Sequence, residues 1–114
     1  MIHIIRTQAT TIVMKEMLAT LGGYIKLAVD VKRRILAGGG AMHADCESVL
    51  LNDGSQQQDV WGADWIPSIQ TVGFESLINI RPRQGNRRLE IEDPNLRSQI
   101  AEVVTQLLGG VPHE

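Results

Sequence analysis

The feature that most constrains this fold is the alternation of apolar and polar residues over residues 24–31, YIKLAVDV. Aliphatic side chains stand at every second position of this segment: Ile25, Leu27, Val29 and Val31. A period of two is typical of a strand with one face toward a core, because successive side chains of an extended chain point to opposite sides. The pattern therefore predicts a strand, and residues 33–37 predict a second strand that returns beside it as a hairpin.

Periodicity and turn residues predict the remaining elements. Further strands are predicted at residues 2–6, 57–66, 74–81 and 88–92, with a loop at 67–73. One helix follows a cap at Thr10 or Thr11 and ends at the glycines of residues 22–23, and a second covers residues 43–53. The last helix begins after Asp93, an N-cap residue followed by a proline, and ends at residues 109–110.

These elements predict an α+β fold of two layers, in which about three helices pack on one face of a mixed or mainly antiparallel sheet. The chain has 114 residues, which is enough for one hydrophobic core and too few for two. We therefore expect a single domain over residues 1–114, with a frayed tail at residues 110–114.

Charge and hydropathy exclude several classes of protein. The net charge is −2, so no overall field draws the chain to nucleic acid or anionic lipid, and we do not expect a nucleic-acid partner. No apolar run approaches the ~20 residues that span a bilayer, which excludes a membrane protein. Residues 1–6 lack the longer apolar run of a signal peptide. Because Cys46 is the single cysteine, no internal disulfide can form, and we expect a cytoplasmic protein.

Residue types that bind metal ions occur at His43, Asp45 and Glu47. A histidine and two carboxylates can hold Mg²⁺, Mn²⁺ or Fe²⁺, and on a strand all three would share one face. On a helix, which the pattern predicts, only His43 and Glu47 share a face. We therefore favour the alternative, in which Asp45 interacts with the helix dipole and Glu47 is solvated. The sequence identifies no particular cofactor.

Arginines are concentrated in a segment rich in turn residues, where the candidate ligand-binding residues are Arg81, Arg83, Asn86 and Arg87. Guanidinium groups bind phosphate and carboxylate through two parallel hydrogen bonds, and Gly85 would let the backbone approach an anion. The segment thus predicts a site for a phosphate-bearing ligand, although it matches no known phosphate-loop motif. The alternative is that these arginines pair with acidic residues of the chain or are solvated at a hairpin tip.

Two tryptophans, Trp61 and Trp65, lie four residues apart, so a strand would place both on one face together with Asp59. Exposed tryptophans can stack on a base or a sugar, or contact another protein. In a chain with few other aromatic residues they more often belong to the core. We favour a core or dimer-interface role and keep Trp61 as a candidate ligand-binding residue.

Several motifs in the chain resemble those of a known family. They are His43-Ala44-Asp45, Asp53-Gly54-Ser55, Asp59-Val60-Trp61-Gly62 and Arg81-Pro82-x-x-Gly85-Asn86-Arg87. The family consists of short prokaryotic proteins and is catalogued only as a domain of unknown function. The resemblance runs from residues 24–31 to the final helix. It implies a compact single-domain protein and no particular activity, so it assigns no catalytic residue.

Two functions are compatible with these residues. The first is a small cytoplasmic binding or regulatory module that dimerises or binds a protein partner, and it needs only a compact fold with aliphatic and charged surfaces. The alternative is a metal-dependent hydrolase or nuclease-like enzyme acting on a phosphate-bearing substrate, with catalytic candidates His43, Asp45 and Asp59. The enzyme requires these acidic residues and the arginines to face each other across a concave pocket. We favour the binding module.

Overall fold

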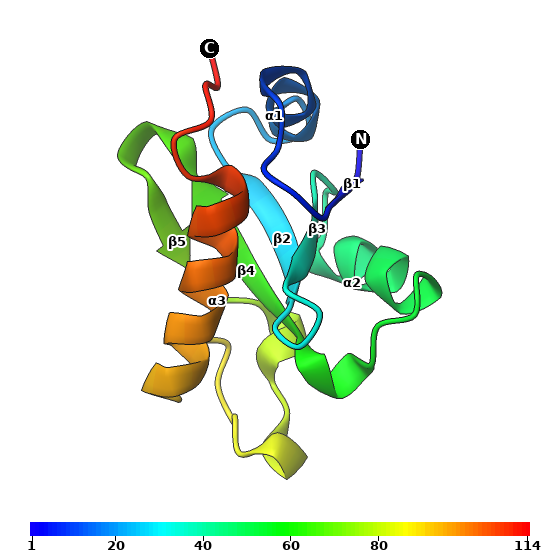
Figure 1. The fold of residues 1–114 in the computed structure, drawn as a ribbon. Helices are drawn as coiled ribbons and strands as arrows, with labels where there is room; N and C mark the ends of the chain where they lie inside the picture. The colour runs from blue at the N-terminus through cyan, green and yellow to red at the C-terminus, as the bar shows by residue number, and fades with distance from the viewer.

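One antiparallel sheet organises the molecule, and a computed structural model describes all of residues 1–114 (Figure 1). Its five strands lie in the order β1-β3-β2-β4-β5. They are β1 (His3–Ile5), β2 (Ile25–Asp30), β3 (Ile35–Gly38), β4 (Val60–Ile66) and β5 (Thr71–Gly73). The three α-helices are α1 (Thr11–Leu18), α2 (His43–Asn52) and α3 (Pro94–Leu108). The four 3₁₀ turns are η1 (Gln57–Asp59), η2 (Pro67–Ile69), η3 (Leu77–Asn79) and η4 (Pro82–Gln84).

Strand β2, the segment with the clearest alternation, occupies the centre of the sheet. It pairs with β3 along one edge and with β4 along the other, so Ala28 lies opposite Ala37 on one side and Gly62 on the other. The aliphatic side chains of β2, including Leu27 and Val29, are fully buried. The predicted strand and the predicted hairpin with β3 are both confirmed.

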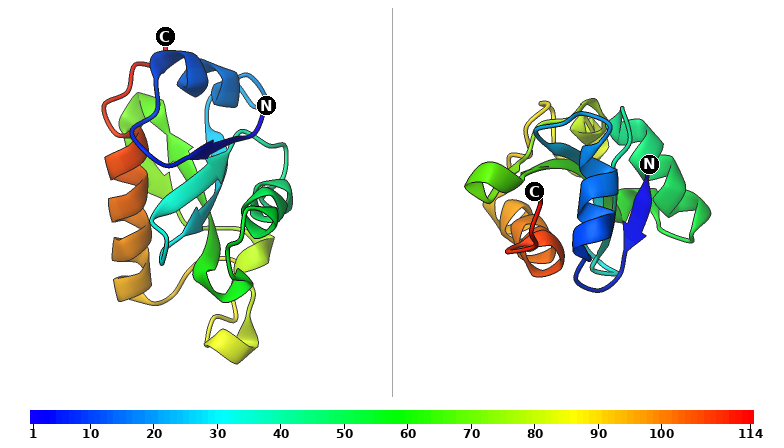
Figure 2. Two further views of the ribbon diagram at one scale, coloured as in Figure 1. Left: turned by 45° about the vertical axis from the view of Figure 1, so that its right-hand side comes forward. Right: turned by 90° about the horizontal axis from the view of Figure 1, so that it is seen from above.

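Helices cover both faces of the sheet (Figure 2). Helices α1 and α3 pack on the face that carries Leu27 and Val29, where they form the larger core. Helix α2 packs on the opposite face, against Ala28 and Ala37. The α+β class and the antiparallel sheet are confirmed, but the two-layer arrangement is not. The reason is that the face of β2 that reads as polar carries the small Ala28, beside Ala37 of β3, and these two residues let α2 pack closely.

Two helices begin at the N-cap residues predicted from the sequence. The hydroxyl oxygen of Thr10 accepts a hydrogen bond from the N–H of Val13 at 3.2 Å, at the start of α1. The carboxylate of Asp93 accepts one from the N–H of Asn95 at 2.9 Å, at the start of α3. Beyond α3, Val111 is buried in the larger core, so the tail expected to fray is anchored near its start. None of the helices is long and apolar enough to cross a membrane.

Residues 74–92 form a long loop, which we call the β5–α3 loop, in place of the strands predicted at 74–81 and 88–92 (Figure 1). It contains the turns η3 and η4 and two isolated bridges, one of which joins Glu75 to Glu90. Strand β5 falls within the loop predicted at 67–73, and the strand predicted at 57–66 begins only after η1. Strand β5 pairs only with residues 64–66 of β4, so a side chain of the β5–α3 loop, rather than a strand, bonds to this edge of β4 near residue 62.

Candidate functional site

The β5–α3 loop is attached to the outer edge of β4 by the side chain of Asn79. Its amide nitrogen donates to the carbonyl oxygen of Gly62 at 3.0 Å, and its amide oxygen accepts from the N–H of Gly62 at 2.8 Å. Asn79 is fully buried, so water does not compete for these bonds. The side-chain amide thus takes the place of a neighbouring strand. Gly62 provides the space, because a Cβ there would lie 2.5 Å from the Cβ of Ser76.

Arg81 fastens the same loop near the start of β4 and uses every N–H donor of its guanidinium group. The acceptors are the carbonyl oxygens of Gln57, Val60 and Ile78, the amide oxygen of Gln84 and the carboxylate of Glu47. The guanidinium also lies over the ring of Trp61, 4.4 Å from its centroid. Since no donor of Arg81 is left for a ligand, its role in this structure is to hold the loop.

The ion pair between Arg81 and Glu47 joins the loop to α2. The nitrogen and oxygen atoms are 3.2 Å apart, and the side chains are only 10% and 13% exposed. Burial raises the pKa of Glu47, an effect that the charge of Arg81 opposes. Burial likewise lowers the pKa of Arg81, and Glu47 opposes that change. Each pKa shifts toward the neutral form, so the loss of hydration of the two charges outweighs their mutual attraction. The hydrogen bonds from Arg81 to backbone carbonyls therefore help to stabilise the buried guanidinium.

Asn86 holds the tip of the β5–α3 loop from inside. Its amide nitrogen donates to the carbonyl oxygens of Asn79, Arg88 and Glu90 at 2.8, 3.0 and 3.1 Å. Its amide oxygen accepts from the N–H of Glu92 at 2.9 Å. Because Asn86 is buried, these bonds fix the path of a segment that has little regular secondary structure.

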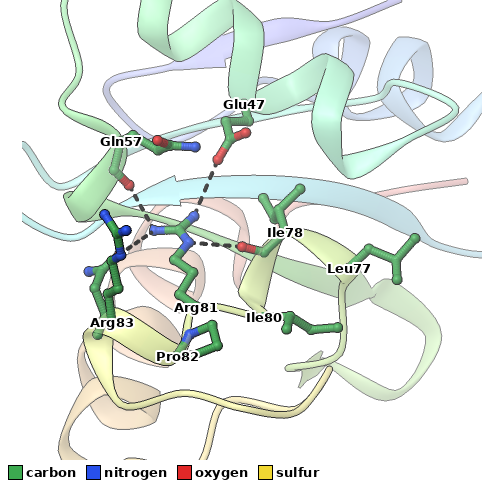
Figure 3. A pocket seen from close by; sticks show the side chains of 9 residues that line it. Glu47, Gln57, Leu77, Ile78, Ile80, Arg81, Pro82 and Arg83 are labelled. Carbon is green, nitrogen blue, oxygen red and sulfur yellow. Dashed lines mark hydrogen bonds and ion pairs between the residues drawn. The ribbon is translucent and has the colours of Figure 1, made fainter.

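A cleft of about 610 Å³ opens between α2 and the β5–α3 loop (Figure 3). The charged residues that line it are Glu47, Arg81 and Arg83. Leu77 and Ile80 form part of its apolar wall, although 71% and 45% of their surfaces are exposed to solvent. Arg83 is exposed and makes no hydrogen bond or ion pair within the protein. The cleft therefore presents one free cation together with two exposed aliphatic side chains.

Comparison with known proteins places the chain in a family. Residues 3–107 match the model of a family described as "Protein of unknown function (DUF5674)". The chain belongs to this family. The matched residues of DUF5674 include all five strands and both walls of the cleft. No curated protein and no solved structure matches the chain.

In this DUF5674 protein, the residues predicted to bind a phosphate-bearing ligand separate into two pairs. Arg81 and Asn86 are engaged with the protein itself, as described above. Arg83 and Arg87 are exposed, and their guanidinium groups contact no acceptor in the structure. Only Arg83 of this second pair lines the cleft. The structure therefore does not gather the four residues around one ligand.

The residues predicted to bind a metal ion are also separated. The Nε2 atom of His43 lies 2.9 Å from a carboxylate oxygen of Asp64, whereas Asp45 is exposed to solvent. No group of three or more histidine, cysteine, aspartate or glutamate side chains is arranged to hold a metal ion. The favoured alternative is correct in placing Asp45 in the first turn of α2. It is wrong in expecting a solvated Glu47, whose side chain is only 13% exposed and pairs with Arg81.

The remaining predicted site residues lie in the core or stand alone. Trp61 and Trp65 are buried in the larger core, which agrees with the favoured role for this pair and removes Trp61 from contact with a ligand. Asp59, the third catalytic candidate, is partly buried in η1, and its side chain makes no hydrogen bond or ion pair. None of these residues lines the cleft.

Sequence reasoning missed Asn79, Leu77 and Ile80, which define the site. Asn79 carried a signal, because it is the one polar residue of the run LINI at residues 77–80 and a polar residue in an apolar run indicates a buried, hydrogen-bonded group. The exposure of Leu77 and Ile80 carried none, since aliphatic residues in a segment predicted as a strand are expected to be buried.

Proposed function

We propose that this protein is a small binding module whose cleft, between α2 and the β5–α3 loop, receives a partner. The observation that carries the proposal is the exposure of Leu77 and Ile80 on a loop held in place by buried side chains. Asn79 and Arg81 hydrogen-bond this loop to β4 and η1, and Asn86 bonds to a backbone carbonyl within the loop, so the protein itself engages these polar groups. A preformed loop of this kind suits binding, because ordering a mobile loop on association costs free energy.

The energetics of the exposed side chains support the same role. Burying a leucine or isoleucine side chain stabilises a protein by about 1.5–3 kcal/mol, a gain that Leu77 largely forgoes and Ile80 partly forgoes in the isolated chain. Single exposed apolar residues are common and need no explanation. Here, however, two of them line one cleft together with an unpaired cation, Arg83. A partner that covers them gains the hydrophobic free energy that folding leaves unused.

No observation favours the alternative of a metal-dependent hydrolase or nuclease-like enzyme. That alternative requires His43 and Asp45 to act together and to face the arginines across a pocket. His43 instead pairs with Asp64, and Asp45 points to solvent on a different side of α2. The cleft contains a single acidic residue, Glu47, and Arg81 neutralises it.

We also propose that the module acts in the cytoplasm, as a regulator that occupies a surface of its partner. The support for the compartment comes from Cys46, the single cysteine of the chain. Its thiol is buried and donates to the carbonyl oxygen of Lys26 at 3.5 Å, and burial raises the pKa of the thiol. A fold that uses its cysteine as a small core residue does not depend on an oxidising compartment.

An NMR fragment screen tests the binding role without knowledge of the natural partner. The ¹⁵N-labelled protein is titrated with a library of small carboxylate-bearing aliphatic fragments, and backbone amide shifts are followed. We expect the largest shifts to cluster at Gln57 and within residues 77–84, because Gln57 and most residues of this segment line the cleft. Shifts that scatter over the surface, or that cluster on the polar groove beside Glu102 of α3, would contradict the proposal.

A further inference from the structure

We infer, on the basis of the proposed function, that the partner is an acidic and apolar segment of another protein. Its aliphatic side chains would cover Leu77 and Ile80, and a carboxylate would pair with Arg83. The inference depends on the charge that the cleft leaves free, on the position of its apolar side chains and on the symmetry of self-association.

Only one of the three charges that line the cleft is free. Glu47 and Arg81 form an ion pair at 3.2 Å, and every donor of Arg81 is occupied. Arg83 has no acceptor of its own and is exposed. Its planar guanidinium offers paired donors that match a carboxylate. The cleft is therefore selective for a negative group, and a lysine or arginine of a partner would be repelled.

The apolar side chains point to a protein segment rather than to a small metabolite. Figure 3 shows Leu77 and Ile80 on the loop side of the cleft, across from Glu47 on helix α2. With 71% of its surface exposed, Leu77 belongs to an open wall and not to an enclosed cavity. Sites for small molecules bury most of the ligand, whereas a peptide segment can cover an open apolar wall and remain partly solvated.

The same charge disfavours a second copy of this chain as the occupant. A twofold dimer brings identical patches together, so the free Arg83 of each copy would approach a patch that is also positive. Glu47 does not supply the compensating carboxylate, because it is already paired with Arg81 of its own chain. An acidic partner meets no such repulsion.

Selection of short random peptides displayed on yeast tests the inference on the full-length chain. The library is sorted against the native protein, against Arg83→Glu and against Arg87→Glu. The last variant is the matched control, since it makes the same change of charge on the same loop outside the cleft. We expect native protein and the control to enrich peptides that combine leucine, isoleucine or valine with aspartate or glutamate. We expect Arg83→Glu to enrich lysine or arginine instead, and to weaken the best acidic peptide about tenfold.

Each other outcome overturns one identifiable step. Enrichment of apolar peptides without acidic residues, or of acidic peptides that bind Arg83→Glu equally well, would overturn the acidic partner and leave the cleft as a binding site. Peptides that bind a Leu77→Ser, Ile80→Ser variant as tightly as the native protein would overturn the proposed function itself. A dimer that sedimentation velocity detects and that this double variant abolishes would overturn the choice of another protein over a second copy.

Discussion

The carboxylate of Glu47 on α2 lies 3.2 Å from the guanidinium of Arg81 on the β5–α3 loop, in a place that solvent scarcely reaches. Removing one partner of such a pair leaves an uncompensated charge, which costs about 3–5 kcal/mol. We expect Arg81→Met to lower the free energy of unfolding by this amount, because three carbonyl acceptors also lose their donor. We expect Glu47→Gln to cost less, since its amide oxygen can still accept a bond from Arg81.

A variant that carries both substitutions measures the interaction between Glu47 and Arg81 apart from the other contacts of each residue. The combined cost of Glu47→Gln and Arg81→Met is expected to fall short of the sum of the single costs by about 1–3 kcal/mol, because the second substitution removes a charge already left unpaired. Urea unfolding followed by tryptophan fluorescence measures all four proteins, with Trp61 as a local reporter beneath Arg81. Arg83→Met is the control and should change stability by less than about 0.5 kcal/mol. Strict additivity would show that the two residues act independently.

Asn79 provides a second test of how the loop is held. Asn79→Ala leaves the N–H and carbonyl of Gly62 without partners at a buried edge, and each unsatisfied group costs about 1–3 kcal/mol. We expect the free energy of unfolding to fall by about 2–4 kcal/mol and the amide of Gly62 to exchange its hydrogen faster. The exposed Asn95→Ala serves as the control. Unchanged exchange at Gly62 in Asn79→Ala would show that another group protects this edge.

These contacts explain which parts of the fold could be predicted from the sequence. The alternation of residues 24–31 and the caps at Thr10 and Asp93 are local signals, and the structure confirms the elements that they predict. The β5–α3 loop depends on contacts that are distant in the chain, since Arg81 bonds to Glu47 and Asn79 bonds to Gly62. No local pattern reveals that a side-chain amide will replace a strand, and the apolar residues of this segment therefore predict a strand that the structure does not contain.

The candidate site shows the same division. The arginine-rich turn predicts a site for a phosphate-bearing ligand, and in the structure it forms one wall of the cleft. The roles within it could not be assigned, because a guanidinium that binds a ligand and one that binds three backbone carbonyls look alike in sequence. Arg81 and Arg83 are two residues apart, and burial alone distinguishes them: the first is held at the edge of β4 and the second faces solvent.

Asp53 gives the protein a pH dependence with a definite sign. It accepts hydrogen bonds from Arg6 and Arg33, both at 2.7 Å, and these bonds hold the pKa of Asp53 below its ordinary value of 3.8. Because the folded-state pKa lies below the unfolded one, ionised Asp53 stabilises the fold at any pH above about 4, and this contribution disappears as the pH falls through the folded-state value. We therefore expect Asp53→Asn to be less stable than the native protein at neutral pH, with the difference shrinking steadily in acid.

Urea unfolding of both proteins across the acidic range measures that difference. Glu47 titrates with the opposite sign, since its pKa is raised, but it is present in both proteins and cancels from the comparison. Glu75→Gln, at an exposed position outside the helices and without an ion pair, is the control and should change stability by less than about 0.5 kcal/mol at neutral pH. A deficit of Asp53→Asn that stayed constant down to the lowest pH would mean that the ionised carboxylate is not the source of the stability.

The last prediction separates binding from folding at Leu77. With most of its surface exposed, Leu77 contributes little to the core, so Leu77→Ala should change the free energy of unfolding by less than about 0.5 kcal/mol. The matched change in α3, Leu107→Ala, removes a buried side chain and should cost about 2–5 kcal/mol. In the NMR titration the pattern should reverse: Leu77→Ala loses the shifts at the cleft, and Leu107→Ala, where it remains folded, keeps them. If Leu77→Ala lost more than about 1 kcal/mol of stability, Leu77 would have to be counted as part of the core, and its exposure could no longer support a binding site.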